Sequence, residues 1–152
     1  MDFVMARGLD EALAARDAAP GSELLAGGTD LMVEVNLAQH RPSSVVSLRH
    51  APELRVLESR RIGAGVTWAT LERSEYRALA QAARTVGSPQ IRAAGTLGGN
   101  IGTASPAGDG LPWLAALDAS IEVASHTRGT RLVPWSEFFR GVKQTSLADD
   151  EI

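Results

Sequence analysis

The chain has 152 residues, of which 44% are hydrophobic and 22% charged, a composition typical of a globular protein with one well-buried core. The net charge of -3 argues against a broad nucleic-acid surface, which needs a concentrated excess of Lys and Arg. No cysteine is present, which excludes disulfides and cysteine-ligated zinc or iron–sulfur sites on this chain. Neither a signal peptide nor an apolar run of membrane-spanning length is visible, so we expect a cytoplasmic protein.

The first fifty residues predict a helix followed by a strand, turn, helix, strand unit. The expected elements are a helix from Leu9 toward Pro20, a strand over Glu23–Ala26, a helix over Leu31–Ala38 and a strand over Val45–Leu48. A helix that connects two short buried strands favours their parallel pairing. We therefore expect residues 1–50 to form a small lobe and residues 51–152 a larger one.

The second part of the chain predicts short elements on both sides of a segment rich in glycine. Before it we expect strands over Arg55–Leu57 and Arg61–Ala64 and helical stretches over Thr67–Ser74 and Tyr76–Val86. Residues 87–112 contain seven glycines and three prolines, which predicts an ordered loop or a linker with no regular element. After it we expect a helix over Trp113–Leu117, a hairpin of Ile121–Ala124 with Arg131–Val133, and a helical turn over Pro134–Phe139.

The first glycine loop, Leu24–Leu31, reads LLAGGTDL. Two glycines between a strand and a helix allow backbone N–H groups to approach an anion, which suits a phosphate or a diphosphate. The alternative is an ordinary tight turn in which Thr29 or Asp30 caps the following helix. Taken alone, this pattern favours the ordinary turn.

The second glycine loop, Thr96–Asp109, reads TLGGNIGTASPAGD and offers many small donors and acceptors with little steric bulk. The alternative, a disordered linker, is less compatible with Leu97 and Ile101 inside the loop and with the apolar residues after it. Neither loop matches the GxxxxGK[ST] or the GxGxxG pattern. A nucleotide would therefore bind by a different scheme.

These two loops, in this order, resemble the FAD-binding flavoprotein family of xanthine dehydrogenase and carbon monoxide dehydrogenase. That family pairs an AGG-type turn, here Ala26–Asp30, with a TxGGN loop that ends in Asp, here Thr96–Asp109. The stretch VGSPQIRAAGTLGGN and the segment Arg131–Phe139 also resemble the family, so the likeness covers nearly the whole chain. It implies an α+β fold of the PCMH type, with a small parallel βαβ lobe and a larger lobe of mixed or antiparallel sheet with flanking helices.

The resemblance also implies which residues hold the cofactor. The turn Ala26–Asp30 would hold the FAD diphosphate, Thr96–Asn100 would contact the diphosphate and the flavin side, and Asp109 would bind sugar-like hydroxyls. For Asp109 the alternative is a helix cap before Leu111. The implied cofactor contacts are Ala26, Gly27, Gly28, Thr29, Asp30, Val86, Gly87, Thr96, Leu97, Gly98, Gly99, Asn100, Thr103 and Asp109.

The function implied by the resemblance is an electron relay within an oxidoreductase. Electrons from a molybdopterin-binding large subunit would pass two [2Fe-2S] clusters on a small subunit and reach FAD on this chain. No catalytic residue is named, because the flavin carries the redox chemistry. His40, His50 and His126 show no metal-ligand spacing, so no metal site is predicted.

Two departures from the family leave other functions open. Ala93 follows Arg92 where many relatives have Asn, and family members continue past Ile152 into a second domain that this sequence lacks. One rival function is another PCMH-type flavoenzyme, such as a cell-wall precursor reductase. The other is an interaction module that has lost FAD.

Overall fold

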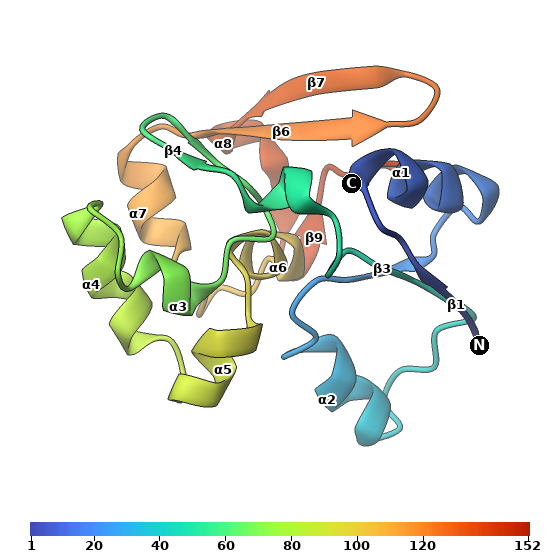
Figure 1. The fold of residues 1–152 in the computed structure, drawn as a ribbon, viewed down its shortest axis with the longest axis horizontal. Coiled ribbons are helices and arrows are strands. Elements are labelled where there is room, and N and C mark those ends of the chain that lie inside the picture. Colours follow the sequence, from blue (N-terminus) through green and yellow to red (C-terminus); the bar gives the residue numbers. More distant parts are fainter.

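A three-stranded parallel sheet forms the N-terminal part of the computed structural model, which describes residues 1–152 (Figure 1). Its strands are β1 (Asp2–Met5), β2 (Glu23–Leu25) and β3 (Ser44–Ser47), in the order β1-β3-β2, connected by α1 (Leu9–Ala18) and α2 (Leu31–Asn36). The predicted parallel pairing of β2 and β3 is confirmed. No strand is predicted for β1, because its apolar run Phe3–Met5 is only three residues long and does not alternate with polar residues.

The central strand β3 is buried on both faces because consecutive β-branched residues, Val45 and Val46, are 4% and 1% exposed. Val46 forms a small apolar cluster with Ala6, Ala12 and Leu48. Ala12 lies on α1, and its small side chain allows the helix to approach the sheet closely. This cluster is separate from the main core of the molecule.

The main core lies among short helices on the other side of the molecule (Figure 1). The elements here are the 3-10 helix η1 (Pro52–Arg55), strands β4 (Leu57–Glu58) and β5 (Arg61–Ile62), and helices α3 (Trp68–Leu71), α4 (Arg77–Thr85) and α7 (Leu111–Ala116). Trp68, Leu71 and Leu79 are at most 2% exposed and fill its centre. The strand predicted over Arg61–Ala64 and the helices predicted over Thr67–Ser74 and Tyr76–Val86 are present with shorter bounds, and the helix predicted over Trp113–Leu117 begins earlier, at Leu111. The strand predicted over Arg55–Leu57 is wrong except at Leu57, because Arg55 ends η1 and β4 begins at Leu57.

Two helices occupy the glycine-rich segment for which no regular element is predicted, so that prediction is wrong. They are α5 (Pro89–Ala94) and α6 (Leu97–Thr103). Each begins with a side-chain cap: Ser88 Oγ accepts the N–H of Ile91 at 3.3 Å, and Thr96 Oγ1 accepts the N–H of Gly99 at 3.0 Å. Tertiary hydrogen bonds at the start of α6 offset the low helix propensity of its glycines.

Two antiparallel hairpins complete the fold. The predicted hairpin is confirmed as β6 (Ser120–Ser125) and β7 (Gly129–Pro134), followed by α8 (Trp135–Phe138). The second hairpin, β8 (Phe139–Gly141) with β9 (Gln144–Thr145), is not predicted because its strands are only two or three residues long. Phe138 is 1% exposed and packs with Val123 and Val133. None of the helices has the length and apolar character needed to cross a membrane.

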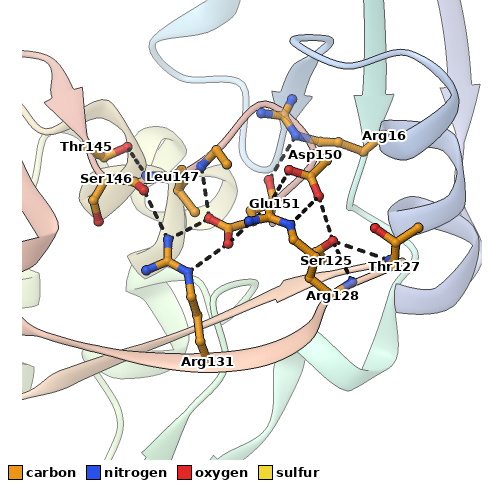
Figure 2. A network of polar contacts seen from close by, with 11 residues as sticks. Arg16, Ser125, Thr127, Arg128, Arg131, Thr145, Ser146, Leu147, Asp150 and Glu151 are labelled. Carbon is orange, nitrogen blue, oxygen red and sulfur yellow. Dashed lines mark hydrogen bonds and ion pairs between the residues drawn. The ribbon is translucent and has the colours of Figure 1, made fainter.

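The last residues of the chain return to the N-terminal helix and to the first hairpin. Ile152 exchanges two backbone hydrogen bonds with Ala124 on β6, of 2.8 and 2.9 Å. Arg16 of α1 donates from Nε to the carbonyl oxygen of Glu151 at 2.9 Å, and Arg131 of β7 holds the carboxylate of the same residue (Figure 2). This network fastens the small sheet and its helix to the β6–β7 hairpin.

Candidate functional site

The turn Ala26–Asp30 joins β2 to α2 and lies against the end of α5. Gly28 has φ +76°, a conformation that residues with a side chain rarely adopt. A Cβ on Gly27 would lie 2.7 Å from the Cα of Gly95 and also against the carbonyl of Ala94, so only glycine allows this close approach. The glycine pair is thus required by the left-handed backbone at one position and by the neighbouring helix at the other.

Free backbone donors line this turn. None of the six consecutive N–H groups from Ala26 to Leu31 donates a hydrogen bond within the chain. Buried or half-buried backbone N–H groups are normally paired, and a run of free ones in a turn is an anion-binding concavity. The alternative in which Thr29 or Asp30 caps α2 is wrong, since Asp30 occupies the cap position and no side chain there accepts a hydrogen bond from the helix. The backbone donors of the turn are therefore left free.

The second glycine loop begins as α6, and the N–H groups of Leu97, Gly98 and Gly99 at the start of this helix are already occupied. Leu97 donates to the carbonyl of Val66 at 2.9 Å, Gly98 to that of Ala64 at 2.8 Å, and Gly99 to Thr96 Oγ1 at 3.0 Å. These bonds fix α6 against the residues that precede α3. The glycines of α6 thus expose backbone without side chains, whereas the run of free donors lies in the first loop.

The two glycine loops meet at the start of α2. A Cβ on Gly99 would lie 4.0 Å from the Cβ of Ala26, and one on Gly95 would lie 3.4 Å from Thr29 Oγ1. At the other end of α6, Thr103 Oγ1 donates to Asp30 Oδ2 at 3.3 Å. The hydrogen bond between Asp30 and Thr103 therefore links two segments that are 73 residues apart in the sequence.

The tip of the β8–β9 hairpin reaches the same place. Lys143 donates from Nζ to Glu34 Oε1 of α2 at 2.7 Å, and its backbone N–H donates to the carbonyl of Ala104, the residue after α6, at 3.0 Å. The hydrogen bond to Glu34 raises the pKa of Lys143, and the hydrogen bond from Lys143 lowers the pKa of Glu34. Nothing in the sequence patterns singles out Lys143 as part of this site.

One polar atom beside α6 has no partner. Asn100 Oδ1 is buried and accepts no hydrogen bond within the chain. A Cβ on Gly108 would lie 3.0 Å from this oxygen, and one on Gly110 3.2 Å, so the second glycine loop folds back over Asn100. Buried polar atoms of this kind call for a partner from outside the chain, such as water or a ligand.

Most of the predicted site residues line one large open cleft, whose 61 lining residues come from both glycine loops and from most other elements. Its volume is about 1740 Å³, more than the roughly 300–1,000 Å³ of sites for drug-sized ligands. The predicted residues that line it are Ala26, Gly27, Gly28, Thr29, Asp30, Val86, Thr96, Leu97, Gly98, Gly99, Asn100 and Thr103.

Two predicted residues, Gly87 and Asp109, lie outside the lining of the cleft. Asp109 is exposed and follows the buried Gly108. The alternative role of Asp109 as a helix cap is wrong, because Gly110 occupies the cap position of α7 and no side chain caps that helix. The Asp109 carboxylate is therefore free to accept hydrogen bonds.

The comparisons with known proteins agree with this geometry. The family model described as the FAD binding domain in molybdopterin dehydrogenase matches residues 1–152. The nicotinate dehydrogenase FAD-subunit of Eubacterium barkeri is 43% identical over 85% of this chain and 47% of its own length. The nicotine 6-hydroxylase medium subunit of Paenarthrobacter nicotinovorans is 38% identical over 86% of this chain and 49% of its own length.

Solved structures share the whole fold. A chain of carbon monoxide dehydrogenase from Hydrogenophaga pseudoflava superimposes with a TM-score of 0.93 at 28% identity, covering 100% of this chain and 56% of its own length. The present chain thus spans about half the length of the relatives that it matches. It belongs to the family of FAD-binding domains found in molybdopterin dehydrogenases.

Proposed function

We propose that the chain is the FAD-binding, electron-transfer part of a molybdenum hydroxylase or dehydrogenase complex. The observation that carries this proposal is the row of six free backbone N–H groups at Ala26–Leu31, which faces the glycine helix α6 across one cleft. Such a row donates to the oxygens of a diphosphate without any Lys or Arg in the turn itself. The residues present therefore fit a dinucleotide cofactor.

The individual contacts are part of the proposal. The turn Ala26–Asp30 would hold the diphosphate, the backbone surface of Thr96–Asn100 would lie along the cofactor, and Val86, Gly87 and Thr103 would contribute further contacts. The unpaired carboxylate of Asp109 suits a sugar hydroxyl, because an ionised carboxylate only accepts hydrogen bonds. The buried Asn100 Oδ1 likewise lacks a donor that the cofactor could supply.

The chemistry would come from the bound flavin, which accepts and donates electrons, while this chain binds and orients it. These 152 residues contain no cysteine, so cysteine-ligated iron–sulfur clusters would lie outside them. We propose as partners a molybdopterin-binding large subunit and an iron–sulfur small subunit, in a cytoplasmic complex. In this proposal residues 1–50 and 51–152 are two lobes of one FAD-binding domain, and further flavin contacts come from a domain that corresponds to the rest of the relatives' length.

The test is whether the protein carries FAD. The purified chain is supplied with FAD, passed through a desalting column, and its flavin is released by heat and identified by chromatography. We expect FAD in a ratio approaching one per chain, reduced at least fivefold in Asp109→Ala but not in Asp2→Ala, which removes an exposed carboxylate from β1. A colourless wild-type chain would contradict the proposal and favour an interaction module without flavin.

A further inference from the structure

Lys143 is the only lysine of the chain, since the other 14 of its 15 basic residues are arginines. It lies at the tip of the β8–β9 hairpin with φ +55°, in the left-handed region that favours glycine. A residue with a side chain is strained there unless its surroundings hold it. The backbone bond to Ala104 and the ion pair with Glu34 are the contacts that hold it.

Lys143 joins the three segments that meet at the site. Lys143 lies in the hairpin that follows α8. Its backbone N–H donates to the carbonyl of Ala104, the residue after α6, and its side chain contacts α2. The side chain also lines the cleft, close enough to Asp30 for their charges to attract. Lys143 therefore lies at the edge of the turn that carries the free N–H groups.

Without a nearby cation, the charges around the first glycine loop would disfavour the binding of a diphosphate. Asp30 ends the turn and Glu34 lies one helical turn further along α2, so two carboxylates flank the place proposed for a doubly charged anion. Like charges repel, and Lys143 is a cation that pairs with Glu34 and is attracted by the charge of Asp30. Its compact ammonium has three donors on a flexible stem, so it can hold Glu34 and a phosphate oxygen together.

We propose that Lys143 is a positioning residue for the cofactor diphosphate: it clamps α2, the helix that follows the first glycine loop, to the end of α6 and supplies the positive charge that the turn lacks. This inference rests on the proposed function as an FAD-binding protein. It goes beyond that proposal because it assigns to the cofactor site a residue from the unpredicted hairpin.

A role of Lys143 in stability can be distinguished from a role in cofactor binding by comparing melting temperatures with FAD affinities. The side chains of Lys143 and Glu34 are 60% and 36% exposed, and exposed ion pairs contribute little to stability. Removal of the Lys143 ammonium should therefore leave the melting temperature of the ligand-free protein nearly unchanged while it weakens the binding of FAD. Arg140, an exposed cation on β8 of the same hairpin that does not line the cleft, offers a matched control.

The first experiment measures FAD dissociation constants and ligand-free melting temperatures for the wild type and three variants. We expect Lys143→Met to bind FAD at least tenfold more weakly, Lys143→Arg to bind within about threefold of the wild type, and Arg140→Met to match the wild type. Equal affinities for Lys143→Met and Arg140→Met would overturn the inference and leave FAD binding intact. A wild-type chain that does not bind FAD would overturn both.

A second experiment measures the reactivity of the Lys143 amine with and without FAD. Reductive methylation modifies amines, so it reports on Lys143 and on the α-amino group of Met1, which serves as an internal reference in mass spectrometry. We expect saturating FAD to slow the methylation of Lys143 at least fivefold and to leave that of Met1 unchanged. Equal rates at Lys143 with and without bound FAD would overturn its contact with the cofactor.

Discussion

Arg131 on β7 holds the carboxylate of Glu151 with two hydrogen bonds of 2.7 Å each, from Nε to Oε1 and from Nη2 to Oε2. Glu151 is only 2% exposed, although it is the second-last residue of the chain. Its carboxylate also accepts the N–H of Ala148 at 2.9 Å. This paired geometry fastens the terminal segment to the first hairpin and to α1.

Glu151→Gln should destabilise the protein by about 2 kcal/mol at pH 7, the usual size of a lost hydrogen bond to a charged group. The bond from Arg131 lowers the pKa of Glu151 in the folded protein. The contribution of the pair is therefore complete above the unfolded pKa of about 4.3 and is lost as the pH falls through the lowered folded value. Urea unfolding at pH 7 and pH 3 should show a smaller difference between wild type and variant at pH 3.

Glu75→Gln is the control for this measurement, because Glu75 is exposed and forms no ion pair. It should unfold like the wild type at both pH values. A difference between Glu151→Gln and the wild type that stays constant from pH 7 to pH 3 would exclude a charge-dependent role for Glu151.

Two glycines of the same helix should respond in opposite ways to alanine. A Cβ on Gly98 would lie 2.5 Å from the Cβ of Ala64 and 2.7 Å from its carbonyl oxygen, whereas one on Gly102 meets nothing within 4 Å. Gly98→Ala should lower the free energy of unfolding by about 1–3 kcal/mol through overpacking. Gly102→Ala should raise it by roughly 0.5–1 kcal/mol, because alanine favours the helix. Thermal unfolding that shows the same sign for both variants would refute the packing of α6 against Ala64.

Thr96 should stabilise α6 through its hydroxyl. It is 7% exposed and caps the helix by accepting the N–H of Gly99. Thr96→Ala should cost about 1 kcal/mol, a fall of roughly 3 °C in melting temperature for a chain of this size. Thr96→Ser keeps the hydroxyl and should stay within about 1 °C of the wild type. Equal losses for both variants would assign the effect to the methyl group and its packing.

Patterns that depend on local spacing predicted much of the fold. The β2, α2, β3 unit and the β6–β7 hairpin follow from short apolar runs bounded by turn residues, and both are present. The apolar run of β1 is only three residues long, and the very short strands β8 and β9 carry no apolar run, so none of the three was predicted. The sequence pattern did not reveal helices α5 and α6, because glycines and prolines outnumber the apolar residues at helical spacing there. The capping residues Ser88 and Thr96 are the local sequence signal for these two helices.

The site was only partly accessible to sequence reasoning. The glycine loops can be found because few residues other than glycine allow a positive φ or a backbone contact as close as that of Gly27. Lys143 could not be found in the same way, since its place depends on how an unpredicted hairpin folds against α2. Nor could the sequence show that the N–H groups of Leu97 and Gly98 are already occupied, because those bonds join residues about thirty positions apart.

The most direct test of flavin binding is isothermal titration calorimetry of the wild-type chain with FAD, with Gly27→Ala alongside. A Cβ at Gly27 would collide with the end of α5 and displace the turn that carries the free N–H groups. We predict saturable heat with one FAD per chain for the wild type and at least tenfold weaker binding for the variant. No saturable binding by the wild type, or equal affinity in the variant, would contradict the role of this turn as the diphosphate site.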